Sequence, residues 1–129
     1  MNTTGKAAVV VGPNHLAPVL KTGCVNVMST AIMAALMEEA SCVAIQNAKV
    51  DRASVGVALN LTHRRPSAPG AHVYAVSKIT DFTPKAIAFE IEAFDETGLI
   101  GAATHKRVFV EKEPFEKKCY ENAKKAQGK

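Results

Sequence analysis

The chain has 129 residues, of which 47% are hydrophobic and 22% charged, and its 16 Lys and Arg against 12 Asp and Glu give a net charge of +4. This length is that of one ordinary domain, residues 1–129, and the apolar content suffices for one core, which excludes an intrinsically disordered chain. So small a positive charge is not the polybasic signature of a nucleic-acid-binding protein. The central run without acidic residues, Lys or Arg, 22–37, is too short and too polar to span a membrane.

Cysteine and histidine usage gives no sign of a metal or a disulfide framework. Cys24, Cys42 and Cys119 are odd in number and form no CxxC motif or Cys/His cluster. The apolar run 7–11 after Lys6 is too short for a secretory signal. No phosphate-cradling glycine loop is present. We therefore expect a reduced, cytoplasmic protein without a metal or cofactor.

The first half of the chain predicts a strand and a helix. Residues 7–11 are typical of a short buried strand, which ends at the turn Gly12-Pro13-Asn14. From Ser29 or Thr30 to about Asn47 there is no Gly or Pro, and Ala, Leu, Met, Glu and Gln dominate. This segment predicts a long helix with Ser29 or Thr30 as its N-cap.

The second half predicts strands joined by turns. Apolar and small or polar residues alternate over 54–63, β-type residues resume over 72–80, and a clear alternation returns over 87–93. Turns are expected at 81–85 and at the hairpin 95–98, which leads into a long strand over 99–110. The basic tail, 114–129, predicts a helix that frays at its end.

The long helix is apolar on two sides. One arc of its helical wheel is formed by apolar residues with Asn47 among them, and the opposite arc holds Ala31, Ala34, Ala35, Cys42 and Ile45 with Glu38 near its middle. A helix that is apolar nearly all round is expected to be buried nearly all round. A buried acid such as Glu38 costs free energy and needs a partner or a purpose.

One short strand, one long helix and four longer strands predict an α+β architecture, in which an antiparallel sheet wraps around one central helix. This is the layout of the hotdog fold. Because the arc that carries Glu38 cannot face the same sheet, we expect a second subunit to cover it. The sequence therefore predicts a homodimer, or a dimer of such dimers.

Three segments carry a family resemblance. Residues 27–38 place Thr30 and Glu38 eight apart, residues 54–63 hold Gly56 and His63, and residues 101–107 end in Thr-His-Lys-Arg at Arg107. In this order and spacing they resemble the fluoroacetyl-CoA thioesterase-like branch of the hotdog-fold acyl-CoA thioesterases. The resemblance implies a catalytic set of Thr30, Glu38 and His63, with Gly56 and Arg107 at the substrate. It implies an acyl-CoA substrate and no cofactor, since coenzyme A is part of the substrate.

These residue types suit thioester hydrolysis, which needs an attacking oxygen, a base and donors for the oxyanion. His63 can act as base or acid near neutral pH, Glu38 can activate water or orient the histidine, and free N–H groups at the helix start near Thr30 can meet negative charge. Thr30 is then the nucleophile or positions a water. The alternative for Thr30 alone is a plain N-cap.

The chain departs from the fluoroacetyl-specific pattern before the helix. Phenylalanines lie nine and six residues before the threonine in that enzyme, where this chain has Lys21 and Cys24. We therefore expect an ordinary small acyl-CoA as substrate. The rival interpretation is a hotdog acyl-CoA-binding or regulatory module without turnover, and a hydratase would need an Asp and His pair that is not seen. Arg64-Arg65 and the lysine pairs 117–118 and 124–125 are candidates for the phosphates of coenzyme A, with a solvated face as the alternative for the lysines.

Overall fold

The computed structural model describes residues 3–128 and contains five strands, two α-helices and one short 3-10 helix. In chain order these are β1 (Thr4–Val10), η1 (Pro13–His15), α1 (Thr30–Asn47), β2 (Ala53–His63), β3 (His72–Phe82), β4 (Ala86–Asp95), β5 (Gly98–Val110) and α2 (Lys112–Gln127). The predicted order of one short strand, a long helix and four longer strands is confirmed.

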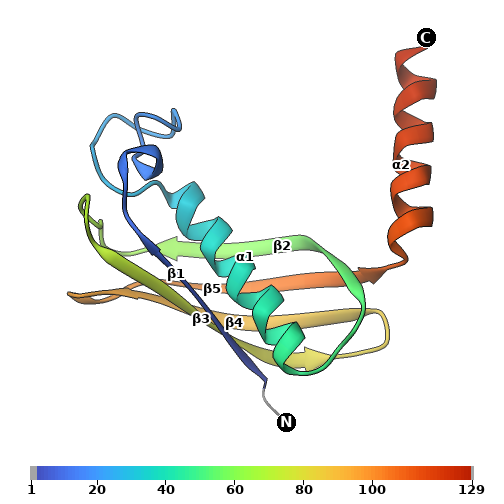
Figure 1. Cartoon of the computed structure of the whole chain (residues 1–129), viewed down its shortest axis with the longest axis horizontal. Coiled ribbons are helices and arrows are strands. Elements are labelled where there is room, and N and C mark those ends of the chain that lie inside the picture. The colour runs from blue at the N-terminus through green and yellow to red at the C-terminus, as the bar shows by residue number, and fades with distance from the viewer. Residues whose placement is uncertain (1–2, 129) are drawn as a thin grey trace.

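The five strands form one antiparallel sheet in the order β1-β3-β4-β5-β2. Figure 1 shows α1 lying across one face of this sheet, with β1 and β2 at its two edges. Inward-facing residues alternate along β4, where Ile87, Phe89, Ile91 and Ala93 are all buried, as their spacing predicts. They pack with Met33, Met37 and other residues of α1 into one core, so the predicted hotdog architecture is confirmed.

The start of α1 is set by Ser29. Its side-chain oxygen accepts a hydrogen bond from the Ala31 N–H at 3.1 Å, and its backbone is extended, as in an N-cap. Of the two candidate caps, Ser29 is therefore the one used. Thr30 is the first helical residue, and its hydroxyl is free for another partner.

Only one side of α1 is buried by this chain. Its buried residues run from Met33 to Ile45 on the sheet side, whereas Thr30, Ala31 and Ala35 are exposed and Glu38 is partly exposed. Burial of the helix nearly all round depends on the expected second subunit and stays a prediction, whereas Ile45 belongs to the core of the single chain instead of the opposite arc. The exposed side consists mostly of small residues around one carboxylate.

The element boundaries differ slightly from those expected. β1 begins at Thr4, and β3 continues to Phe82 because a bulge between Ile79 and Asp81 lets its pairing with β4 go on. The C-terminal helix is confirmed from Lys112, although the last residue of the predicted tail, 129, lies outside the described residues. Figure 1 shows α2 projecting from the end of β5 away from the sheet, and none of its described side chains is buried. Within residues 3–128, neither helix has the length and hydropathy that crossing a bilayer requires.

Candidate active site

Thr30 and His63 meet at the N-terminal end of α1. Thr30 Oγ1 lies 2.8 Å from His63 Nδ1, within hydrogen-bond distance, although the residues are 33 positions apart in the chain. α1 supplies the threonine from its first turn, and β2 supplies the histidine from its last residue. A hydroxyl beside an imidazole is the arrangement in which the histidine can take the hydroxyl proton.

The second nitrogen of His63 has an unusual environment. Its Nε2 atom is buried and has no hydrogen-bond partner among residues 3–128. Burial lowers the pKa of His63 below its ordinary value of 6.5, and the backbone of Arg65 opposes part of this shift. The lowered pKa keeps the imidazole neutral near pH 7, which is the form that a base needs.

The Thr30–His63 pair opens into a cavity of about 390 Å³. Its lining also includes Cys24 and Val25 from the loop before α1, and Arg64 and Arg65, which follow His63. A larger hollow of about 570 Å³ lies on the outer face of the sheet and is lined by residues that include Asn60 and Glu90, but it contains neither Thr30 nor His63. The smaller cavity is therefore the candidate site.

The helix start offers fewer free donors than the sequence predicts. The Ala31 N–H bonds the Ser29 side chain, and the N–H groups of Ile32 and Met33 bond the Ser29 carbonyl at 3.0 and 3.2 Å. Among the first helical residues this leaves the Thr30 N–H as the candidate donor to an oxyanion. The expectation of several free donors is wrong, because the same serine that caps the helix uses most of them.

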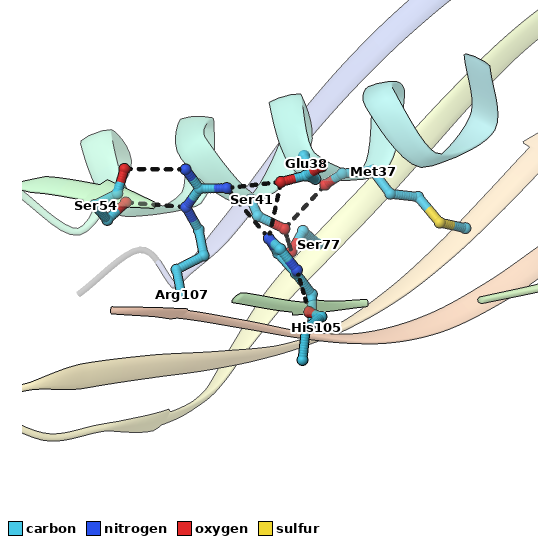
Figure 2. A network of polar contacts seen from close by, with 8 residues as sticks. Met37, Glu38, Ser41, Ser54, Ser77, His105 and Arg107 are labelled. Atoms are coloured by element: carbon cyan, nitrogen blue, oxygen red, sulfur yellow. Dashed lines mark hydrogen bonds and ion pairs between the residues drawn. The ribbon is translucent and has the colours of Figure 1, made fainter. Parts of the chain in front are cut away.

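Glu38 belongs to a second polar cluster farther along α1. Figure 2 shows the Glu38 carboxylate pointing toward Arg107 and His105 of β5. Arg107 Nη1 donates to Glu38 Oε1 at 3.1 Å, and His105 Nε2 lies 3.7 Å from the same oxygen. The Arg107 guanidinium is buried and also donates to the Ser54 hydroxyl at 2.9 Å and the Ser54 carbonyl at 3.2 Å. These bonds hold the arginine rigidly beneath a carboxylate whose side chain is 43% exposed.

His105 completes this cluster through contacts of both its ring nitrogens. Its Nδ1 atom lies 2.8 Å from the Ala58 carbonyl, which can only accept, so Nδ1 carries the proton. In the neutral ring Nε2 is then an acceptor, and Arg107 Nη1 donates to it at 3.3 Å. His105 therefore orients Arg107, a positioning role that the sequence analysis did not assign. Ser54 was also missed, and nothing local in its sequence distinguishes it from another strand serine.

Gly56 lies against the cluster for a steric reason. A Cβ atom on this residue would come 2.5 Å from Glu38 Oε1, 3.2 Å from His105 Cε1 and 3.3 Å from Arg107 Nη1. Its register partner on β5 is Arg107, and the pairing of β2 shifts just after it. Only a glycine lets the carboxylate and guanidinium approach the β2 backbone so closely.

The predicted catalytic set is thus divided between two places in one chain. Thr30 pairs with His63, whereas the polar contacts that the structure gives Glu38 within residues 3–128 are with Arg107 and His105. Thr30 and Glu38 are eight positions apart on the helix, or about 12 Å along its axis. Gly56 and Arg107, predicted at the substrate, lie with Glu38. No group of three or more His, Cys, Asp or Glu among the described residues is placed to hold a metal ion.

A model of the fluoroacetyl-CoA-specific thioesterase family matches residues 11–113, which include both clusters. The chain belongs to this thioesterase family. The family's enzymes are thioester hydrolases. A search of curated proteins finds no significant match.

Solved structures agree with the family in their fold. The fluoroacetyl-CoA thioesterase FlK is 24% identical, with a TM-score of 0.84 over 94% of this chain and 95% of that one. A Thermus thermophilus protein described as a thioesterase superfamily member is 21% identical, with a TM-score of 0.85 over 98% and 94%. The phenylacetic acid degradation protein PaaI of the same organism, as a mutant, is 18% identical, with a TM-score of 0.71 over 85% and 88%. The hotdog fold is therefore shared across this thioesterase family and its structural neighbours.

Proposed function

We propose that this family member hydrolyses a small acyl-CoA thioester to the free acid and coenzyme A. The observation that carries the proposal is the 2.8 Å contact between the Thr30 hydroxyl and His63 Nδ1 at the wall of a cavity. A neutral imidazole can accept a proton from Thr30, or from a water that Thr30 holds, as the oxygen attacks the thioester carbonyl. The same imidazolium can then protonate the leaving thiolate.

The proposal includes a homodimer, because Glu38 lies too far from Thr30 to act on the same atom within one chain. A two-fold axis passing beside Ala34, midway between the two, would place Glu38 of one copy next to Thr30 of the other. The helix face between them supports this packing, since Ala31 and Ala35 are small and exposed. β2 is also an edge strand with an unpaired side, which a second copy of β2 can extend.

In this arrangement Glu38, Arg107 and Gly56 of one copy complete the site that Thr30 and His63 begin in the other. The buried Arg107 holds the Glu38 carboxylate in place, and the carboxylate can orient a water or the histidine of the second copy. The homodimer therefore forms two equal sites about one axis.

The first experiment measures free thiol release from a panel of short, medium and aromatic acyl-CoAs. Thr30→Ala, Glu38→Gln and His63→Ala should each lower kcat by about 100-fold or more while the circular dichroism spectrum stays unchanged. Glu39→Gln and His72→Ala are matched controls at exposed positions outside both clusters, and they should keep full activity. Binding of acyl-CoA without any thiol release would instead establish the non-catalytic module.

Subunit mixing tests whether the site is shared. Thr30→Ala and Glu38→Gln subunits are mixed, unfolded and refolded together. If each site uses Thr30 of one copy and Glu38 of the other, half of the dimers are mixed and contain one intact site, so about a quarter of wild-type activity should return. If each site lies within one chain, no activity returns. Light scattering on the same samples reports whether the chain is a dimer.

A further inference from the structure

The chain corner after His63 carries two arginines with different environments. Both backbone N–H groups, of Arg64 and Arg65, donate to the Ile100 carbonyl, at 2.8 and 3.1 Å, which fixes the corner against the sheet. The Arg65 side chain is engaged, since its Nη1 donates to the Thr97 carbonyl at 3.1 Å. The Arg64 side chain is exposed and has no hydrogen bond or ion pair within residues 3–128.

The cavity beside this corner is positively charged. Arg64 lines it together with Thr30 and His63, and Arg65 is its other permanent cation. The lining contains no Asp or Glu, so no carboxylate within the cavity neutralises the free guanidinium. An arginine fork in such a place can bind carboxylate or phosphate oxygens through two parallel hydrogen bonds.

We propose that Arg64 is a specificity-determining residue that binds an anionic oxygen group of the thioester substrate. The group is a carboxylate at the far end of the acyl chain or a phosphate of coenzyme A, since both offer the paired oxygens that a guanidinium binds. This inference rests on the proposed thioesterase function. Arg64 lines the same cavity as Thr30 and His63, so that one substrate can reach both the guanidinium and the reacting pair.

The experiment compares three thioesters. Succinyl-CoA carries a carboxylate and phosphates, butyryl-CoA carries phosphates only, and the butyryl thioester of N-acetylcysteamine carries neither. kcat/KM is measured for wild type, Arg64→Gln and Lys85→Gln. Lys85→Gln is the matched control, because it removes one positive charge from an exposed side chain in the turn between β3 and β4, which does not line the cavity.

If the ligand is a carboxylate, Arg64→Gln should lower kcat/KM for succinyl-CoA by about three- to tenfold and leave both butyryl substrates within twofold. If it is a phosphate, both coenzyme A substrates should fall by that factor and the N-acetylcysteamine thioester should not. Equal losses on all three substrates, no loss on any, or the same pattern in Lys85→Gln would overturn the assignment of Arg64.

Failure of the proposed function is recognised separately. A wild-type protein that hydrolyses none of the three compounds is not a thioesterase for them. The same comparison is then made by calorimetric binding of succinyl-CoA, coenzyme A and the N-acetylcysteamine thioester. Weaker binding to Arg64→Gln of succinyl-CoA alone, or of both succinyl-CoA and coenzyme A, would still support the anion site, whereas unchanged or absent binding of all three compounds would overturn it.

Discussion

The substitution Gly56→Ala should separate activity from stability at this site. The added methyl group would lie 2.5 Å from Glu38 Oε1, about 0.9 Å short of the 3.4 Å at which ordinary van der Waals contact begins. The distances to His105 Cε1 and Arg107 Nη1 need to grow by only one or two tenths of an ångström. The carboxylate must therefore move by nearly 1 Å and weaken its bond to Arg107.

The cost in stability should be small. Glu38 is 43% exposed on its side chain, so it can rotate toward solvent without opening the core. Because the ion pair it leaves is partly solvated, the loss should be about 1 kcal/mol, or about 4 °C in Tm. Catalysis is more sensitive to position, since a 1 Å misplacement costs roughly 100-fold in rate.

Thermal unfolding and thiol release on the same samples measure both effects. The double variant Gly56→Ala with Glu38→Gln is the decisive control: if Gly56 acts by positioning Glu38, the double variant should be hardly slower than Glu38→Gln alone. A Gly56→Ala protein with kcat within threefold of wild type would show that the position of Glu38 is unimportant. If the losses in kcat of the two single variants instead multiply in the double variant, Gly56 acts on a group other than Glu38.

Three further predictions concern the fold and pH. Gly5→Ala should lower the free energy of unfolding by about 3 kcal/mol, or Tm by about 10 °C, because the new Cβ would collide with the rigid backbone of α1. A decrease in Tm of less than about 3 °C in a thermal melt would contradict this prediction. Burial lowers the pKa of His63 in the folded chain, so the unfolded chain binds more protons below about pH 6.5 and the free energy of unfolding should fall on acidification. Between pH 7 and pH 5, urea unfolding should show a smaller fall for His63→Gln than for wild type. An identical fall in both proteins would refute this prediction. Ser67→Ala removes the buried hydroxyl that donates to Asp95 Oδ2 at 2.7 Å and should cost about 1–2 kcal/mol in urea unfolding, whereas Ser67→Thr, which keeps the donor, should cost less.

The division of the site into two clusters explains why a single chain looks incomplete. His63 Nε2 is buried without a hydrogen-bond partner among the residues that the structure describes, and the small-residue face of α1 around Glu38 is open to solvent. A buried polar atom without a hydrogen bond costs free energy that a bound ligand or a rearranged contact can recover. The exposed face lies between the two clusters, where the proposed second copy would pack.

The local patterns of the sequence determined the elements of this protein. Alternation over 54–63 and 87–93 and the Gly-free run to Asn47 predicted strands and a helix, since each depends on neighbours within a few residues. Distant contacts were decided by the tertiary structure. The sequence left Ser29 and Thr30 as alternative caps. In the structure the Ser29 side chain caps the helix, and the Thr30 hydroxyl lies against His63, a contact between distant residues that only the fold brings about. It likewise placed Glu38 beside Arg107, 69 residues away, because the sheet order sets β5 under the middle of α1 and no local periodicity encodes that order.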